Sequence, residues 1–263
     1  MNNVIGRTII YLLFYKFLIS NSQLVWIIEE DFEHPGTHHM ERDEALAREL
    51  IQDPDLPNVV RLYSWQPFGV SIGYQQRMES IDIDACKKAE IDVVRRPTGG
   101  RAVLHANELT YAVVMKADSK EGIYAAHNRI VTTLVDAIRI LGDEGKELEI
   151  TAHSDGRNIR NAYTEGTLTN VACFTSAARH EVTWHGRKVI GSAQRRFGDV
   201  LLQHGSILLA DDHLRLPDLL AISDAERIKM SEMLINETAT LSDVFGRKIG
   251  IQECAEAIRT NWK

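Results

Sequence analysis

The decisive stretch of this sequence is Arg95-Arg96-Pro97-Thr98-Gly99-Gly100-Arg101-Ala102-Val103-Leu104-His105. Strand-like apolar runs precede and follow its two glycines. Adjacent glycines between such runs indicate that another group approaches the backbone too closely to leave room for a Cβ. The flanking arginines indicate that this group is polar or anionic at one end. The stretch alone fits two interpretations: a wall of a binding site, or a hairpin turn with solvated arginines.

The chain has 263 residues, of which 44% are apolar and 25% charged, with a net charge of −7. A chain of this length buries a large core without disulfide staples, and its negative charge argues against a general nucleic-acid binder. Three cysteines, Cys86, Cys173 and Cys254, are too few and too widely spaced for a disulfide framework. We therefore expect a cytoplasmic globular protein.

Residues 1–23 differ from the rest of the chain. Their apolar run at residues 9–19 is too short to span a bilayer and is interrupted by Lys16. No small-x-small cleavage site follows it, which argues against a signal peptide. We expect residues 1–23 to be an apolar tail or the product of a start codon placed too far upstream, without stable membrane insertion. Residues 24–263 are expected to form one domain with a helical C-terminal segment.

Apolar periodicity predicts an α+β fold. Strands are expected at residues 24–28, 59–65, 68–74, 110–116, 181–184, 187–194 and 200–209. Helices are expected at residues 39–51, 83–90 and 123–141, and a helical segment with one turn near Gly246 at residues 214–263. Asp82 is the expected N-cap of the second helix, and Gly142 ends the third.

Three further local features carry predictions. His185-Gly186 is a two-residue hairpin loop, which sets Trp184 opposite Arg187 and Thr183 opposite Lys188. Gly205 suggests a bulge in its strand. Residues 143–172 are polar and without periodicity, which is typical of a long functional loop.

Cys173 is the candidate nucleophile, because it ends the long loop just before the strand-rich segment. A reactive cysteine needs a positive charge nearby to hold it as a thiolate. Lys188, fifteen residues later and on one strand face with Ile190 and Ser192, would supply that charge. The alternatives are a packing cysteine and a solvated hairpin lysine. Cys86 and Cys254 stand among alanines of predicted helices, as small core residues do.

Small residues at 191–193 leave space on the sheet face for an acyl chain or a cofactor, or for a closely packed helix. Residues 203–206 add polar atoms that belong either to a site or to a satisfied buried network. Among the histidines only His38 and His39 cluster, so no metal site is expected. The sequence contains no P-loop, no G-x-G-x-x-G and no G-x-S-x-G, which disfavours nucleotide and nucleophile-elbow chemistry.

Residues 95–105, followed by Glu-Leu-Thr-Tyr at 108–111, resemble the signature of the biotin/lipoate protein ligase superfamily. Residues 186–194 and 202–207 resemble its second and third signatures, and residues 43–46 its first-helix motif. The resemblance implies the superfamily's catalytic-domain fold, a mixed, largely antiparallel β-sheet flanked by helices. Ala172-Cys173-Phe174 and Gly-Gly-Arg, where ATP-dependent lipoate ligases tend to have three glycines, are similar to cysteine-dependent octanoyltransferases of the LipM type.

This resemblance implies octanoyl transfer from octanoyl-acyl carrier protein to a lysine of a lipoyl carrier domain, such as glycine-cleavage H protein. Cys173 would carry the acyl thioester, and Lys188 would lower the cysteine pKa and transfer protons, without ATP, metal or another cofactor. A monomer is expected. The expected substrate-binding residues are Arg96, Thr98, Gly99, Gly100, Arg101, His105, Gly191, Ser192, Ala193 and His204. The alternatives are an ATP-dependent lipoate–protein ligase, an amidotransferase and a non-catalytic acyl-binding relative.

The chain departs from the family pattern at Ala106, where an aspartate is common, and at residues 176–180, which lack the expected aromatic side chains. The N-terminal tail has no family counterpart. Basic residues nevertheless gather in the site-forming segments, which predicts a local positive face for acidic carriers. They are Arg95, Arg96, Arg101, Arg187, Lys188, Arg195 and Arg196.

Overall fold

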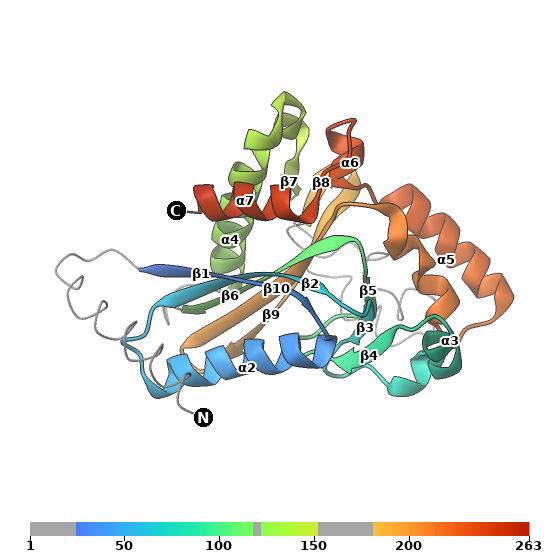
Figure 1. The fold of residues 1–263 in the computed structure, drawn as a ribbon, viewed down its shortest axis with the longest axis horizontal. Helices are drawn as coiled ribbons and strands as arrows, with labels where there is room; N and C mark the ends of the chain where they lie inside the picture. The colour runs from blue at the N-terminus through green and yellow to red at the C-terminus, as the bar shows by residue number, and fades with distance from the viewer. Residues whose placement is uncertain (1–24, 118–121, 152–180, 263) are drawn as a thin grey trace.

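The computed structural model describes residues 25–117, 122–151 and 181–262. In this part of the chain the strands form a seven-stranded sheet, in the order β1-β2-β6-β10-β9-β8-β7, and a three-stranded sheet, in the order β4-β3-β5 (Figure 1). Neighbouring strands are antiparallel except for β1–β2 and β3–β4. This confirms the predicted α+β fold with a mixed, largely antiparallel sheet. The strands are β1 (Trp26–His34), β2 (Asn58–Trp65), β3 (Gly69–Ile72), β4 (Asp92–Arg95), β5 (Val103–His105), β6 (Glu108–Lys116), β7 (Glu149–Thr151), β8 (Glu181–Trp184), β9 (Arg187–Phe197) and β10 (Val200–Leu208).

Helices cover both faces of the larger sheet (Figure 1). α2 (Gly36–Gln52) packs on one face, and α4 (Ile123–Ile138) and α7 (Ile251–Asn261) pack on the other. The smaller sheet packs against α3 (Ile83–Lys88), α5 (Asp224–Glu237) and a 3₁₀ helix, Asp211–Leu219. α6 (Leu241–Val244) precedes α7. No described helix is both long and apolar enough to cross a membrane.

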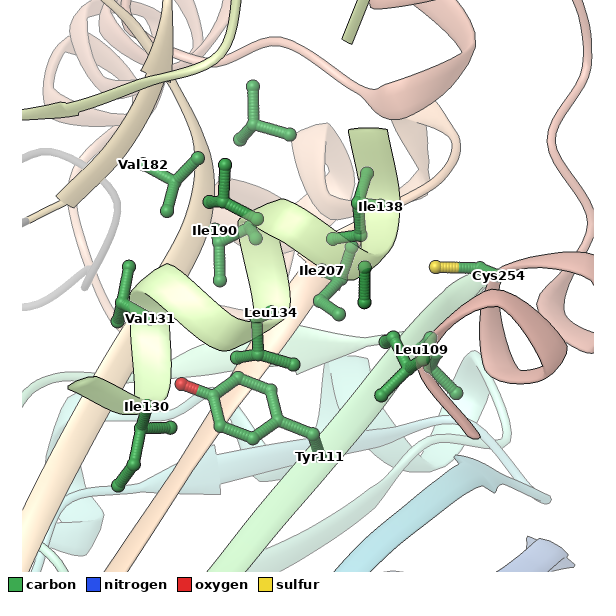
Figure 2. Packing of buried hydrophobic residues seen from close by; sticks show 14 of the residues in the cluster. Leu109, Tyr111, Ile130, Val131, Leu134, Ile138, Val182, Ile190, Ile207 and Cys254 are labelled. Carbon is green, nitrogen blue, oxygen red and sulfur yellow. The ribbon is translucent and has the colours of Figure 1, made fainter. Parts of the chain in front are cut away.

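The largest core cluster lies between the larger sheet and α4. Figure 2 shows Ile130, Leu134 and Ile138 of α4 over Leu109 and Tyr111 of β6, and these side chains are buried. Their spacing of four residues places them on one helix face. A second cluster joins α2 to the opposite face of the same sheet. Because both faces are covered, every residue of β2 is buried.

The structure confirms most of the predicted elements and corrects several boundaries. β1 continues to His34, beyond the predicted 24–28, because an edge strand tolerates charged side chains that break the apolar pattern. α2 begins at Gly36, directly after the extended N-cap Pro35. The Asp82 N-cap is confirmed, since its carboxylate accepts a hydrogen bond from the Ala85 N–H at 2.9 Å.

The C-terminal segment contains more breaks than the one predicted near Gly246. Ser223 and Thr240 each begin a new helix through a capping box, with Glu226 and Asp243 as reciprocal partners. The start of the predicted loop at 143–172 instead forms a 3₁₀ helix, Asp143–Glu147, and β7. The remainder of that loop, from residue 152, lies outside the described residues.

The His185-Gly186 hairpin is confirmed in both turn and register. The φ angles are 49° at His185 and 75° at Gly186, as a two-residue turn with positive φ at both positions requires. Trp184 pairs with Arg187 and Thr183 with Lys188. The same ladder then shifts by one residue, so that Val182 pairs with Ile190.

The turn at residues 96–102 is not a hairpin. β4 and β5 do not pair with each other: both pair with β3, from opposite sides. The turn therefore carries the chain past the end of β3, where the Tyr74 N–H donates to the Thr98 carbonyl at 2.8 Å. A Cβ on Gly73 would clash with the Gly100 backbone, and Gly100 has φ of 95°. Close approach of the two backbone segments explains Gly73, and the positive φ angle explains Gly100.

Gly205 is not a bulge, because the register of β10 with both β6 and β9 is continuous across it. A Cβ at this position would clash with the Gly191 carbonyl and would lie 2.8 Å from the Tyr111 ring. The close approach of β9, β10 and the Tyr111 ring therefore requires a glycine.

Gly205→Ala is expected to lower the free energy of unfolding by about 1–3 kcal/mol, because the added methyl group overpacks this contact. Urea titration followed by circular dichroism measures the change. Gly99→Ala is the matched control, since no heavy atom lies within 4 Å of its Cβ position, and a change of at most about 0.5 kcal/mol is expected. Equal losses in the two variants would contradict the packing argument.

Candidate active site

A cavity lies between the α2-covered face of the larger sheet and the smaller sheet. Small residues of β9 and β10 leave this space open. Side chains of the smaller sheet close it from the other side. The lining residues are Met40, Tyr63, Ser71, Arg96, Val103, His105, Thr110, Gly191, Ser192, Ala193, His204, Gly205 and Ser206.

One buried chain of hydrogen bonds connects α2, β10 and the glycine turn through His204. Asp43 is buried and accepts from His204 Nδ1 at 3.2 Å, which leaves Nε2 to accept from the Thr98 hydroxyl at 2.6 Å. Burial lowers the pKa of His204, although Asp43 opposes the shift. His204 is therefore neutral at pH 7, and it ties the turn to the cavity.

Asp43 also belongs to a buried charge network with β2. Arg61 is fully buried and donates to the carboxylates of Asp43, Asp31 and Glu29, the last at 3.1 Å. The Tyr63 hydroxyl donates to Asp43 at 3.1 Å. Burial alone would raise the pKa of Asp43, but the His204 hydrogen bond and the Arg61 charge outweigh it and lower that pKa. Asp43 is thus held ionised beneath the cavity.

A second series of buried hydrogen bonds passes through His105 on the smaller sheet. Glu108 accepts from His105 Nδ1 at 2.6 Å, and His105 Nε2 accepts from the Ser71 hydroxyl at 2.7 Å. The Trp65 ring stacks on His105 with 4.0 Å between centroids and 3° between planes. Each ring nitrogen has a partner and the ring is clamped, so His105 presents a fixed surface to the cavity.

Arg96 holds the glycine turn in place. Its guanidinium donates to the carbonyls of Ser71 (3.0 Å), Gly99 (2.9 and 3.1 Å) and Arg101 (2.7 Å), and to the Ser71 hydroxyl. A planar fork that reaches several acceptors at once suits this role. Arg96 therefore both lines the cavity and fixes the path of residues 99–101.

Lys188 is 4% exposed, which rules out the solvated-lysine interpretation. Its ammonium group donates to the Glu181 carboxylate. The shift between the Thr183–Lys188 and Val182–Ile190 pairs is a β-bulge, so Lys188 and Ile190 lie on opposite faces. The predicted shared face with Ser192 is therefore wrong. Lys188 instead lies on the cavity-facing side with Gly191 and Ala193, although it does not line the described cavity.

Cys173 lies outside the described residues. Cys86 and Cys254 are buried core residues, as predicted. Burial raises the pKa of the Cys86 thiol to about 11 and that of Cys254 to about 12. Neither thiol is a nucleophile near neutral pH.

The structure brings six of the predicted substrate-binding residues to the cavity: Arg96, His105, Gly191, Ser192, Ala193 and His204. Thr98 bonds to His204 from outside the lining, and Gly99, Gly100 and Arg101 lie in the adjoining turn rather than on the cavity wall. Ala106, at the position where an aspartate is common, is buried in the apolar cluster of the smaller sheet.

Sequence reasoning did not select Tyr63 and Ser71, which line the cavity, or Arg61, which supports it. Asp43 and Glu108, which also support it, stand in the family motifs at 43–46 and 108–111 but were given no role in the site. A signal existed for Arg61, a charged residue in the middle of the apolar run at 59–65. Buried charges need partners. The position of Arg61 in this run therefore indicates that a carboxylate lies close to it.

The described residues contain one group of side chains that could hold a metal ion: Asp31, His38 and His39. No such group was expected, although His34 precedes His38 by four residues and lies 3.3 Å from Asp31. The Asp31 carboxylate already accepts from His38 at 2.8 Å and from Arg61. Since the Arg61 charge opposes a cation at this carboxylate, we assign no metal to the group.

Comparison with known proteins identifies the family. Residues 35–263 match the model of the lipoyl protein ligase A/B catalytic domain, and the chain belongs to that family. Octanoyltransferase LipM of Symbiobacterium thermophilum is 37% identical over 238 residues, 88% of this chain and 83% of the relative. Octanoyltransferase LipM of Clostridioides difficile is 35% identical over 231 residues, 86% of this chain and 81% of the relative.

A solved structure of a bipartite lipoate protein ligase from Thermoplasma acidophilum shares the fold, with a TM-score of 0.68 and 22% identity. The match covers 91% of this chain and 82% of that one. The matched family and these octanoyltransferase relatives show that the chain is an acyltransferase.

Proposed function

We propose that this chain transfers an octanoyl group from octanoyl-acyl carrier protein to a lysine of a lipoyl carrier domain, such as glycine-cleavage H protein. The observation that carries the proposal is the similarity, along more than four-fifths of both chains, to octanoyltransferases. The cavity supports it, because the glycine and alanine of β9 leave a space beside the sheet in which an acyl chain can lie.

The proposed reaction has two acyl transfers. The Cys173 thiolate attacks the carbonyl carbon of the octanoyl thioester, the bond to the carrier sulfur breaks, and the carrier leaves as a thiol after taking a proton. The amine of the acceptor lysine then attacks the octanoyl-cysteine, giving an amide and the free cysteine. A covalent intermediate of this kind gives ping-pong kinetics. The thioester is already activated, so no ATP is needed.

Lys188 has two roles in this scheme. Its positive charge lowers the pKa of Cys173 and so favours the thiolate, and its ammonium group passes a proton to the departing thiolate of the carrier. The position of Lys188 on the cavity-facing side of β9 supports both roles. Backbone N–H groups near Gly191–Ser192 or Gly99–Gly100 would stabilise the tetrahedral oxyanion.

The test is intact-mass analysis of the protein after incubation with octanoyl carrier protein in the absence of ATP. We expect one octanoyl group per chain, on the peptide that contains Cys173, and its loss on addition of unmodified H protein. Labelling only with ATP and free octanoate would identify a lipoate-type ligase instead. Labelling by octanoyl-H protein but not by the carrier would identify an amidotransferase, and no labelling by any donor would refute the proposed acyl transfer.

A further inference from the structure

Arg101 is a buried cation without a hydrogen-bond or ion-pair partner among the described residues. The whole residue is 7% exposed, and its Nη1 atom is buried without a hydrogen-bond acceptor. The guanidinium forms no ion pair and donates no hydrogen bond to any described residue. A buried charge without compensation is strongly destabilising. Such a group is expected where a ligand brings the missing anion.

Two more arginines flank the same turn. Arg95 donates to the carbonyls of Gly73 (2.9 Å), Tyr74 (3.0 Å) and Gln76 (2.7 Å). Arg195 donates to the Pro97 carbonyl at 2.9 Å and lies over the Tyr74 ring, 4.4 Å from its centroid. Carbonyl oxygens fix the positions of these side chains but leave their charge uncompensated. Neither forms an ion pair with a described acidic residue, so the turn carries a local positive potential.

The turn is open to a ligand and adjoins the acyl cavity. No heavy atom lies within 4 Å of the Cβ position of Gly99, so a ligand can approach its backbone closely. Thr98 donates to His204, which lines the cavity. An anion beside Arg101 would therefore lie near the space proposed for the acyl chain.

We propose that Arg101 binds the phosphodiester of the donor's phosphopantetheine arm, with Arg95 and Arg195 attracting the acidic carrier. This inference rests on the proposed function, because a carrier-bound acyl group reaches the enzyme on such an arm. A guanidinium matches the geometry of phosphate oxygens. Nucleotide phosphates and fatty-acid carboxylates share the anionic chemistry, so the experiment must distinguish them.

The kinetic test compares two thioester donors, octanoyl-phosphopantetheine and octanoyl-pantetheine, which differ only in the phosphate. We expect the wild type to be acylated about 10- to 100-fold more efficiently by the phosphate-bearing donor, and Arg101→Gln to lose most of this preference. Arg48→Gln, which removes an exposed arginine of α2, should keep it. An unchanged donor preference in Arg101→Gln would overturn the assignment.

The binding test uses thermal unfolding and needs no turnover. Phosphopantetheine should raise the Tm of the wild type but not of Arg101→Gln, and pantetheine should raise neither. Arg101→Gln without ligand should be at least as stable as the wild type, because it removes an uncompensated buried charge. An Arg101-dependent rise with AMP or octanoate, and none with phosphopantetheine, would overturn the proposal. Failure of octanoyl carrier protein to acylate the wild type would instead refute the proposed function.

Discussion

Lys188→Met is expected to lower kcat/KM for octanoyl transfer by about 10²- to 10⁴-fold, the range lost with a general acid–base group. The ammonium group is buried beside Glu181, so no solvent cation can replace it. In the proposed mechanism its loss raises the pKa of Cys173 and removes the proton donor to the leaving thiolate. Initial rates with octanoyl carrier protein and H protein measure the effect.

Thiol alkylation separates the charge of Lys188 from a merely structural role. Cys86 and Cys254 have a thiol pKa of about 11 and about 12, so iodoacetamide near pH 7 should label Cys173 alone. In Lys188→Met, the pH at which labelling begins should rise. An unchanged pH profile would contradict the role of the lysine in forming the thiolate.

Two variants control for folding and for general charge effects. Lys188→Met removes the ammonium group that pairs with Glu181, so the double variant Lys188→Met/Glu181→Gln removes both charges together and should show the same kinetic loss. Arg187→Met removes the positive charge of the preceding residue, which lies against the Trp184 ring. It should retain transfer, and an equal loss in this variant would attribute the effect to the strand rather than to Lys188.

The elements that the sequence predicted well are those fixed by local rules. The helix at 123–141 was predicted because its apolar spacing matches one buried face, and α4 with the following 3₁₀ turn occupies that range. The hairpin register at residues 183–188 was predicted because a two-residue His-Gly loop leaves one pairing. The smaller sheet was not predicted, since its order β4-β3-β5 depends on pairing between segments that no local pattern connects.

The residues of the candidate site were also predicted only where a local sequence pattern marks them. The signatures selected Arg96, His105 and His204, which line the cavity. They did not reveal that His204 bonds to Asp43, which is 161 positions away in the sequence. Nor does any residue pattern disclose the bulge before Ile190 that reverses the face of Lys188. Bulges near functional sites change the direction of side chains. Here the usual alternation of side chains along a strand therefore predicts the wrong sheet face for Lys188.

Asp43→Asn is expected to lower the free energy of unfolding by about 3–5 kcal/mol at pH 7, because it leaves Arg61 and His204 buried without a full anionic partner. The pKa of Asp43 is lowered in the folded state, so its contribution is present above the ordinary value of 3.8. It disappears as the pH falls through the folded-state pKa. The stability difference between wild type and variant should therefore be constant from about pH 7 to 5 and shrink below about pH 4.

Urea titrations at pH 7, 5 and 3.5 measure this dependence, and Arg42→Gln is the matched control. Arg42 also pairs with Glu29, at 2.9 Å, but its side chain is 35% exposed, so a loss of at most about 1 kcal/mol is expected. A double-mutant cycle with Arg61→Met should give a coupling of about 0.5–3 kcal/mol, since the two side chains are in contact. A loss in Asp43→Asn no larger than in Arg42→Gln would mean that Glu29 and Asp31 alone compensate Arg61. Asp43 would then act on the site through His204 rather than on the stability of the fold.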